Sequence, residues 1–433
     1  MNSSSCVLVE TFRLNRCATV KVAEIGIATE VYTSISQLSN HVWDKIVEPH
    51  NNLFLSHAYL QALENAHRER MSFRYVVFSE RGKKLGAAYF QLFDVRGNEA
   101  LKSSAQTDLE TDPTGSNPVL TRIKRAVKKI SFRQIAKLRL RMLVCGNALL
   151  TGEHGLFFNK KVSKLQANHL LHKAILQIEA DEKAEGRKIS LTLIKDFDES
   201  KADEARNLLN YGFKEINFQP NMVFPLQSEW QTFDNYLQAM HSKYRVRTKK
   251  VLSKRSGLVV KDFTYSDIEQ HLPEIYRYYS EVADSVDFNL LSASPQYFLE
   301  LKQQLSECFK LIGYFKDQTL VGFICAFIGK GHLEVHFTGY NQELNKEHAI
   351  YSNMLYEMVN MGLQNRVKTI GFGRTALEIK STIGAVGTNM PAFIKHSNSL
   401  VHRYLIPLIN QFNQAHWLPR HPFKHHENEG EGL

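Results

Sequence analysis

The chain has 433 residues, more than one ordinary hydrophobic core accommodates, so we expect two or three domains. Its apolar and charged fractions, 43% and 23%, are those of a soluble globular protein, and no apolar run approaches the roughly 18 residues that span a bilayer. The five cysteines are scattered, which excludes a disulfide framework and zinc-ligand spacing and favours free thiols in a reducing cytosol. The formal charge of +10 indicates an anionic partner, such as nucleic acid, a nucleotide phosphate or a lipid headgroup, without choosing among them.

The first half of the chain is predicted to contain both strands and helices. The N-terminal residues before them show only weak periodicity. Periodicity predicts, in chain order, strand 29–32, helix 35–47 capped by Ser34, a helix from Ser56, strand 73–78, strand 85–93, strand 138–144, helix 164–185, strand 189–194 and helix 202–209. Strands 73–78 and 85–93 flank a polar turn and form a hairpin. The segment after the last helix predicts a terminal hairpin through Phe218 and Val223.

A polar and then basic insertion separates two of these strands. Residues 98–118 are rich in Thr, Asp, Ser, Gly and Pro, which is typical of a surface loop. Residues 122–130 predict a short basic helix with Ile123, Val127 and Ile130 on one face. We expect this helix to bind anionic bilayers weakly, and the competing interpretation is that its apolar face packs on the first domain.

The second half begins with a basic helix and continues as a sheet. The stretch 240–255 contains no acidic residue. The elements predicted beyond it are strands 311–315, 320–328 and 332–340, helix 350–363 and strand 368–373. Alternation along 332–340 predicts Leu333, Val335 and Phe337 on one face and His332, Glu334, His336 and Thr338 on the other. The crossover helix implies a parallel pair, and a ligand can sit where such a sheet splays.

The two hairpins resemble each other. In each, an aromatic residue precedes a polar turn and a glycine follows it at the same distance, at Phe78 and Gly86 in the first and at Tyr314 and Gly322 in the second. Each hairpin is followed by a third strand, a helix and another strand. This shared order favours an internal duplication over chance.

The second half resembles the core of the GNAT superfamily of N-acetyltransferases, and more closely its FemAB-like branch. The likeness rests on the element order, on the sequence GFGR at 371–374 and on EIKSTIG at 378–384. The residues Ser242, Lys243, Arg245 and Arg247 are similar to a pattern at the junction of FemAB-like proteins. The resemblance implies an α/β protein of two tandem GNAT-like domains, each a mixed, mostly antiparallel sheet flanked by helices.

The expected organisation follows from this resemblance and from the composition of the chain. We expect an N-terminal segment 1–27, a first domain 28–227 with an insertion at about 98–136, a basic linker helix 228–255, a catalytic second domain 256–397, a C-terminal helix 398–415 and a disordered tail 416–433. The second domain is the expected seat of activity because its strand–helix–strand unit is uninterrupted.

Polar residues near the expected splay are the candidate site. Amide-forming catalysis needs a group that accepts the amine proton and donors that face the oxyanion. We expect His336 to be the base, because imidazole titrates near neutral pH, and Tyr351 to protonate the leaving group. Tyr340 at the strand end completes the expected catalytic set. The expected substrate-binding residues are Asn341, Arg374, Lys380, Arg245 and Arg247.

Ordinary structural roles compete with each of these assignments. A strand histidine such as His336 is more often solvated or bonded to a neighbour, and Tyr351 is as readily a packing residue. The resemblance matches Lys380 to a lysine that contacts the acceptor or the reacting carboxyl group. With Arg374 nearby it makes an anion site, while the plainer interpretation is an exposed pair of charges.

The loop between the third strand and the helix departs from acetyl-CoA-using relatives. Such enzymes use a glycine-rich loop whose backbone N–H groups hold pyrophosphate, and residues 341–349 contain no glycine. We therefore expect no tightly bound cofactor and no metal, with acyl-CoA and aminoacyl-tRNA both open as donors.

The resulting hypothesis is a cytoplasmic acyltransferase, peripheral to the inner face of the membrane. It transfers an acetyl or aminoacyl group to a small-molecule or peptide amine, and we expect weak contact with an anionic membrane or tRNA. The alternative is a non-catalytic tandem module that binds nucleic acid or an anionic membrane through its basic helices. No P-loop, dinucleotide or nucleophile-elbow motif points elsewhere.

Overall fold

The structure is a computed structural model, and it describes residues 26–96, 139–285, 291–403 and 417–424. The insertion, its basic helix and most of the expected C-terminal helix lie outside these residues, so they stay predictions. Within the described ranges, no helix combines the length and the hydropathy needed to cross a bilayer.

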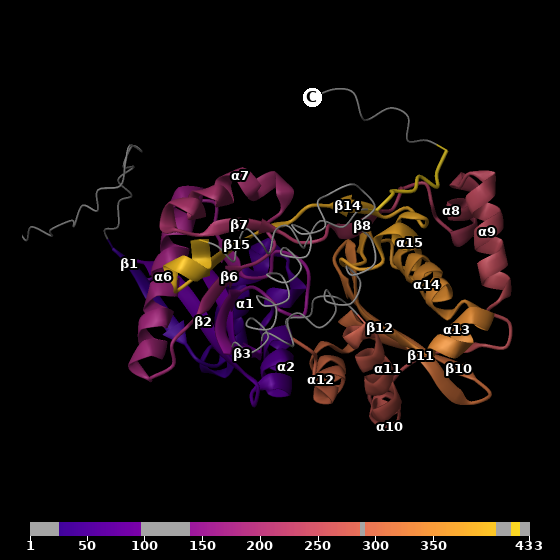
Figure 1. The fold of residues 1–433 in the computed structure, drawn as a ribbon, viewed down its shortest axis with the longest axis horizontal. Coiled ribbons are helices and arrows are strands. Elements are labelled where there is room, and N and C mark those ends of the chain that lie inside the picture. The colour runs from indigo at the N-terminus through magenta and orange to yellow at the C-terminus, as the bar shows by residue number, and fades with distance from the viewer. Residues whose placement is uncertain (1–25, 97–138, 286–290, 404–416, 425–433) are drawn as a thin grey trace, which may run out of the picture.

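Two sheets lie side by side, the first at the left of Figure 1 and the second at the right. The first has the order β1 (Ile27–Tyr32), β2 (Met71–Glu80), β3 (Lys83–Arg96), β4 (Arg139–Cys145), β6 (Leu191–Ile194), β15 (Pro391–His396) and β7 (Lys214–Asn217), with β5 (Leu156–Phe158) beside β3. The second has the order β9 (Val259–Asp262), β10 (Phe309–Lys316), β11 (Thr319–Gly329), β12 (His332–Tyr340), β13 (Thr369–Gly371), β8 (Asn221–Pro225) and β14 (Val386–Thr388). The two orders correspond strand for strand.

Each sheet holds a parallel pair at the same place, β4 with β6 in the first and β12 with β13 in the second. The two hairpins of the predicted duplication also share the same strand register. Phe78 pairs with Gly86 and Tyr314 with Gly322, and in both hairpins the register shifts immediately after the aromatic residue. Two tandem domains with mixed sheets are therefore confirmed.

The predicted hairpin through Phe218 and Val223 is wrong, because the two halves exchange strands. β7 stays in the first sheet, whereas β8 crosses to the second sheet and pairs with β13 and β14. In return β15 from the end of the chain lies between β6 and β7 of the first sheet, as Figure 1 shows. Each sheet thus receives one strand from beyond the predicted boundary between the domains.

Helices cover both faces of the sheets. In chain order they are α1 (Asn40–Val47), α2 (His57–His67), α6 (Lys164–Ala184), α7 (Ala202–Ala205), α8 (Phe233–Ala239), α9 (Ser242–Ser253), α10 (Tyr265–Gln270), α11 (Leu272–Asp284), α12 (Pro295–Leu305), α13 (Gln342–His348), α14 (Ile350–Gln364) and α15 (Leu377–Ser381). The expected helix at 35–47 is broken into a 3₁₀ turn capped by Ser34 and α1 capped by Ser39, because each serine accepts a backbone N–H at its own helix start. The single linker helix expected at 228–255 is likewise two helices, α8 and α9.

One hydrophobic core joins the halves. Residues of α1, α2 and the first sheet belong to the same buried cluster as residues of α10, α11, α12 and the second sheet. At its centre the hydroxyls of Tyr59 and Tyr297 lie 2.9 Å apart, and the Asn147 amide donates to Tyr59 at 2.7 Å. A shared core with satisfied polar groups fixes how the two sheets are placed.

Residues 417–424 contradict the disordered tail predicted for 416–433, and the other residues of that range lie outside the described structure. Phe423 is buried against Phe224, Trp230 and Tyr236 in the core of the second sheet. The Pro422 carbonyl also accepts the His241 N–H at 2.8 Å. One aromatic side chain in a polar segment is enough to anchor it, because burying a large ring contributes about 1.5–3 kcal/mol.

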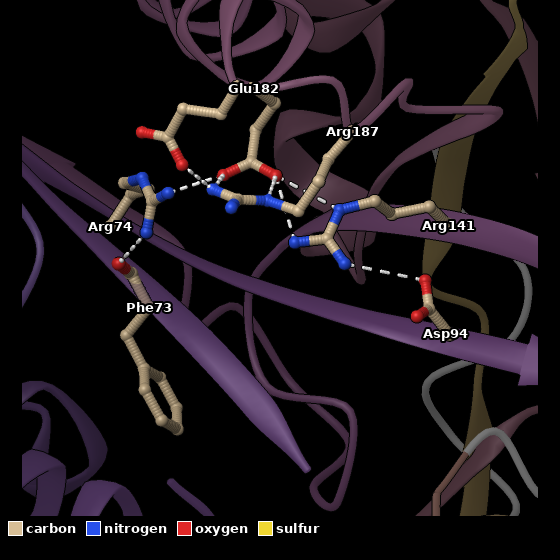
Figure 2. Close-up of polar contacts among 7 residues, drawn as sticks. Phe73, Arg74, Asp94, Arg141, Glu182 and Arg187 are labelled. Atoms are coloured by element: carbon tan, nitrogen blue, oxygen red, sulfur yellow. Dashed lines mark hydrogen bonds and ion pairs between the residues drawn. The ribbon is translucent and has the colours of Figure 1, made fainter. Parts of the chain in front are cut away.

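A buried carboxylate ties α6 to the first sheet. Glu182 is fully buried and is contacted by the guanidinium groups of Arg74, Arg141 and Arg187, as Figure 2 shows. Arg141 also reaches Asp94 at 3.4 Å. Burial alone raises the pKa of Glu182, but hydrogen bonds from Arg187 and Arg141 outweigh it and hold that pKa below the ordinary value.

The faces predicted for β12 hold only in its first half. A bulge sets His336 and Phe337 of β12 against the single residue Cys325 of β11, whose sulfur accepts the Phe337 N–H. Both His336 and Phe337 therefore contact Tyr297, on the face opposite Leu333. The predicted grouping of Phe337 with Leu333 is wrong, because one inserted residue reverses the alternation.

Candidate functional site

The candidate site lies where the two parallel strands of the second sheet separate. β12 pairs with β13 only from His332 to Glu334, and β13 ends at Gly371 while β12 continues to Tyr340. Polar side chains at this point are Glu334 on β12 and Lys380 on α15, and both are buried. A mixed sheet opens at such a point, which is where ligands bind in sheets of this kind.

Glu334 is oriented by its neighbours on both strands. Its Oε2 lies 2.9 Å from His332 Nε2, and His332 Nδ1 lies 2.7 Å from the Thr369 hydroxyl. If Nε2 carries the ring proton, histidine donates to the carboxylate and accepts from threonine. Gly371 makes room for this arrangement, since a Cβ there would lie 2.0 Å from Glu334 Oε2. The first glycine of GFGR thus permits a carboxylate at the splay.

Lys380 is a buried amine within electrostatic range of that carboxylate. Its Nζ donates to the Phe372 carbonyl at 2.5 Å, and the residue is 4% exposed. Burial lowers the pKa of Lys380 to about 7, against the opposing effect of Glu334. A lysine with this pKa exchanges a proton readily near neutral pH, which an ordinary surface lysine does not.

Arg374 leaves the second sheet and reaches the first. Its Nη2 donates to Asp196 Oδ1 at 2.7 Å, and its guanidinium lies 5.1 Å from the centre of the Phe218 ring. Asp196 follows β6 and is fully buried, next to Lys195. Arg374 and Lys380, which were predicted to form one anion site, thus lie on the same segment of the chain. Arg374, however, points to the seam between the two sheets, where Asp196 and Phe218 lie.

His336 lies apart from these groups, among aromatic rings. Its ring stacks on Phe337 at 3.7 Å and lies beside Tyr297 and Phe327. Burial lowers the pKa of His336 to about 3, and its Nε2 has no partner among the described residues. An imidazole with so low a pKa is a weak base at neutral pH, so this position argues against His336 as the general base.

Tyr340, Tyr351 and Asn341 form a separate group at the far end of β12. The rings of Tyr340 and Tyr351 are 5.5 Å apart, and burial raises the pKa of both hydroxyls. Asn341 caps α13 by accepting the N–H groups of two residues in its first turn. Tyr340 lies six positions after Glu334, or about 20 Å along an extended strand, so the structure does not bring this group to Lys380.

Arg245 and Arg247 belong to α9, which packs against α14 rather than at the splay. Arg245 donates to the Met240 carbonyl at 3.0 Å, while Arg247 is exposed.

The residues that sequence reasoning missed are Glu334, His332 and Asp196. The sequence did contain one signal for Glu334. It is a carboxylate inside an otherwise apolar strand, and a later strand ends in the glycine-rich sequence GFGR at 371–374. Asp196 gave no signal, because its partner Arg374 is 178 residues away in the chain.

The loop that would hold a pyrophosphate is a helix in this protein. α13 fills the connection between β12 and α14, and Asn341 Oδ1 already accepts the N–H groups of Glu343 and Leu344. The Tyr351 N–H likewise donates to Asn345 Oδ1. Backbone donors used in this way do not fit the cradle of a CoA pyrophosphate. In the described part of the chain, no cluster of His, Cys, Asp or Glu is arranged to hold a metal ion.

Two corresponding mixed sheets, each with one parallel pair, define a tandem α/β fold, and a fold of this kind is found in the solved structure of FemX. The solved structure of FemX is similar to the chain with a TM-score of 0.51 and 13% identity over 86% of this chain and 99% of that one. A tandem GNAT protein from the clavulanic acid biosynthesis pathway is similar at a TM-score of 0.47 and 8% identity, over 86% and 99% of the two chains. No protein-family model matches the sequence, and no curated protein matches it significantly. At these identities the likeness to FemX shows the fold.

Proposed function

We propose that the chain is an acyltransferase that transfers an acyl or aminoacyl group to an amine between Glu334 and Lys380. The observation that carries this proposal is a buried lysine, with its pKa lowered to about 7, within electrostatic range of a buried carboxylate where β12 and β13 separate. Two such groups supply a proton acceptor and a proton donor at the same point of the sheet. The FemX-like fold supports the placement of a site at this point of the second sheet.

The proposed reaction uses these two side chains in turn. The acceptor amine attacks the acyl carbon, and the new C–N bond forms as the carbonyl electrons move onto oxygen. Charged Lys380 donates to that oxyanion, while Glu334, held by His332, accepts the amine proton. When the oxyanion collapses, the bond to the leaving group breaks, and the leaving group takes the electron pair and a proton from Lys380. Transfer of the proton from Glu334 to Lys380 restores the starting state.

Acyl-CoA and aminoacyl-tRNA are both candidate donors, and the acceptor is a small-molecule or peptide amine. The backbone N–H groups at the start of α13 already have hydrogen-bond partners. This favours an acyl donor that is not anchored at this loop through a pyrophosphate. An aminoacyl ester meets that condition, because its reactive carbonyl needs no such cradle.

A transfer assay with matched variants tests the proposal. The protein is incubated with labelled acetyl-CoA, or with tRNA charged with labelled amino acids, and with a mixture of amines and lysine-containing peptides. Lys380→Met should lower transfer roughly 10- to 150-fold, the value of one charge-assisted hydrogen bond. Glu334→Gln should lower it by about 10²–10⁴-fold through loss of the proton acceptor.

The control is Lys368→Met, which removes an exposed lysine at the other end of β13 and should leave transfer unchanged. Circular dichroism verifies that each variant is folded. Full transfer by folded Lys380→Met, or no transfer from either donor by the wild type, would refute the proposed site or the proposed function.

A second candidate function, binding of nucleic acid or an anionic membrane without catalysis, is favoured by α9. Lys243, Arg247 and Lys250 are exposed at helical spacing along one stripe, while Tyr244 and Val251 pack towards the core. Because its apolar side is already used, the stripe suits a phosphate backbone better than insertion into a bilayer. Lys243→Glu with Lys250→Glu should weaken retention on RNA in low salt, and any acyl transfer by the wild type should persist in this double variant. If the double variant lost both RNA retention and acyl transfer, α9 would instead take part in the transfer reaction.

A further inference from the structure

Three chain segments meet at the seam between the two sheets. The first follows β6 and carries Lys195 and Asp196, and the second is the crossing from β7 to β8, which carries Phe218. The third follows β13 and carries Arg374. The strand exchange brings them together, because β8 leaves the first sheet and pairs with β13 of the second.

Backbone hydrogen bonds place Asn221 beside Arg374. The Met222 N–H donates to the Gly373 carbonyl at 3.1 Å, and the Phe372 N–H donates to the Met222 carbonyl at 2.8 Å. Asn221 comes immediately before Met222, and Arg374 comes immediately after Gly373. Asn221 and Arg374 are therefore neighbours across the antiparallel pair. Met222 faces the core of the second sheet, and alternation therefore puts Asn221 on the opposite face.

Arg374 is held rigidly by the first sheet. Asp196 Oδ1 accepts from Arg374 Nη2, and Asp196 Oδ2 accepts the Gly152 N–H at 3.1 Å. Asp196 adopts a left-handed backbone conformation with φ of +57°, which aims its side chain across the seam. Lys195 Nζ is in turn fixed by two backbone carbonyls, each at 2.8 Å. A guanidinium placed in this way is oriented before any ligand arrives.

Two polar atoms at this place lack partners. Arg374 Nε and Asn221 Oδ1 are both buried, and neither has a hydrogen-bond partner among the described residues. Buried polar atoms in proteins are almost always hydrogen-bonded, so two neighbouring exceptions point to a ligand. The Asn221 amide can turn to present either its oxygen or its nitrogen.

The charges indicate which ligand would fit. Lys195 and Arg374 both lie within ion-pair distance of the single carboxylate of Asp196. Burial alone raises the pKa of Asp196, but Lys195 and Arg374 outweigh it and hold that pKa below its ordinary value. Asp196 is therefore ionised and paired with the Arg374 guanidinium, whereas burial lowers the pKa of Lys195. A group with one negative charge and planar oxygens matches a guanidinium edge.

We propose that the seam binds a carboxylate through Arg374 Nε and the Asn221 amide, and that Asp196 of the first domain is the positioning residue for Arg374. The site is then composite, because neither domain contains all of its groups. Arg374 is two residues from Phe372, whose carbonyl accepts from Lys380. The carboxylate would therefore belong to a molecule that also reaches the splay, but its binding does not depend on any reaction there.

Saturation-transfer NMR on the full chain with paired probes tests the inference without turnover. The probes are hippurate, its uncharged amide hippuramide, and inorganic phosphate, each titrated near neutral pH. Hippurate should bind at least roughly 10-fold more tightly than hippuramide, the value of a charge-assisted hydrogen bond, and should not be displaced by an equal concentration of phosphate. Equal binding of hippurate and hippuramide, or displacement by phosphate, overturns the proposal.

Substitutions test whether the preference for hippurate over hippuramide arises at the seam. Arg374→Gln should abolish the preference for hippurate, whereas Arg206→Gln, which changes an exposed arginine paired with Glu215, should retain it. Asn221→Asp leaves Arg374 in place and adds a negative charge beside the ligand, so it should also abolish the preference if Arg374→Gln fails to fold. An undiminished preference in folded Asn221→Asp refutes the site.

The positioning role has its own test. Asp196→Asn keeps the size of the side chain and removes its charge, so attraction of an anion by charge alone would strengthen hippurate binding. If Asp196 positions Arg374, binding should instead weaken. Tighter binding by folded Asp196→Asn would overturn the positioning role.

Discussion

Replacing Lys380 by methionine should change how the stability of this protein depends on pH. The pKa of Lys380 falls from 10.5 to about 7 in the folded protein because burial disfavours its charged form. Between these two values the unfolded chain binds a proton at this side chain that the folded chain does not. The free energy of unfolding therefore rises with pH across this window, and the lysine destabilises the fold most at and below its folded pKa.

The magnitude follows from the size of the shift. Each pH unit inside the window is worth about 1.4 kcal/mol, and the full shift from 10.5 to about 7 amounts to roughly 5 kcal/mol. Between about pH 7.5 and pH 9.5 the wild type should gain roughly 2.5 kcal/mol relative to Lys380→Met, since the variant lacks this titration. Other titrating groups are common to both proteins and cancel in the comparison.

Urea unfolding followed by circular dichroism at several pH values measures this difference. Lys368→Met, which removes an exposed lysine on the same strand–helix unit, is the control and should follow the wild type. Parallel stability curves for the wild type and Lys380→Met across the window would refute the burial of a titrating amine at this site. They would also remove the proton donor from the proposed reaction.

Three other changes follow from single contacts. Gly371→Ala should cost about 1–3 kcal/mol of stability and reduce transfer, because the added methyl group displaces the Glu334 carboxylate; unchanged transfer would contradict the site. Glu182→Gln should cost about 3 kcal/mol in urea unfolding, since three arginines lose their carboxylate, whereas exposed Glu185→Gln should cost much less; equal costs would contradict the buried network. The pKa of Glu182 is lowered on folding, so this stabilisation should be lost as pH falls through its folded value. Tyr297→Phe should cost about 1–3 kcal/mol by removing a buried hydroxyl between the halves, and no change in thermal unfolding would show that this contact is not a link.

The sequence by itself determined the local elements and their repetition. The aromatic residue, polar turn and glycine of each hairpin predicted two copies, and the structure shows the same register and the same shift at Phe78 and Tyr314. These signals are readable because a hairpin is made of residues close in the chain. Lys380 could also be singled out by its motif, although its burial and its lowered pKa could not.

Only the tertiary structure decided which strands exchange and which side chains meet. The pairing of β8 with β13 and of Arg374 with Asp196 joins residues far apart in the chain, and no local pattern encodes such partners. The bulge at His336 reversed the predicted faces of β12, because alternation fixes a face only while the register is unbroken. The burial that lowers the pKa of His336 is likewise a property of the packed halves. Local energetics therefore set the elements, and the shared core and long-range pairing set the candidate site.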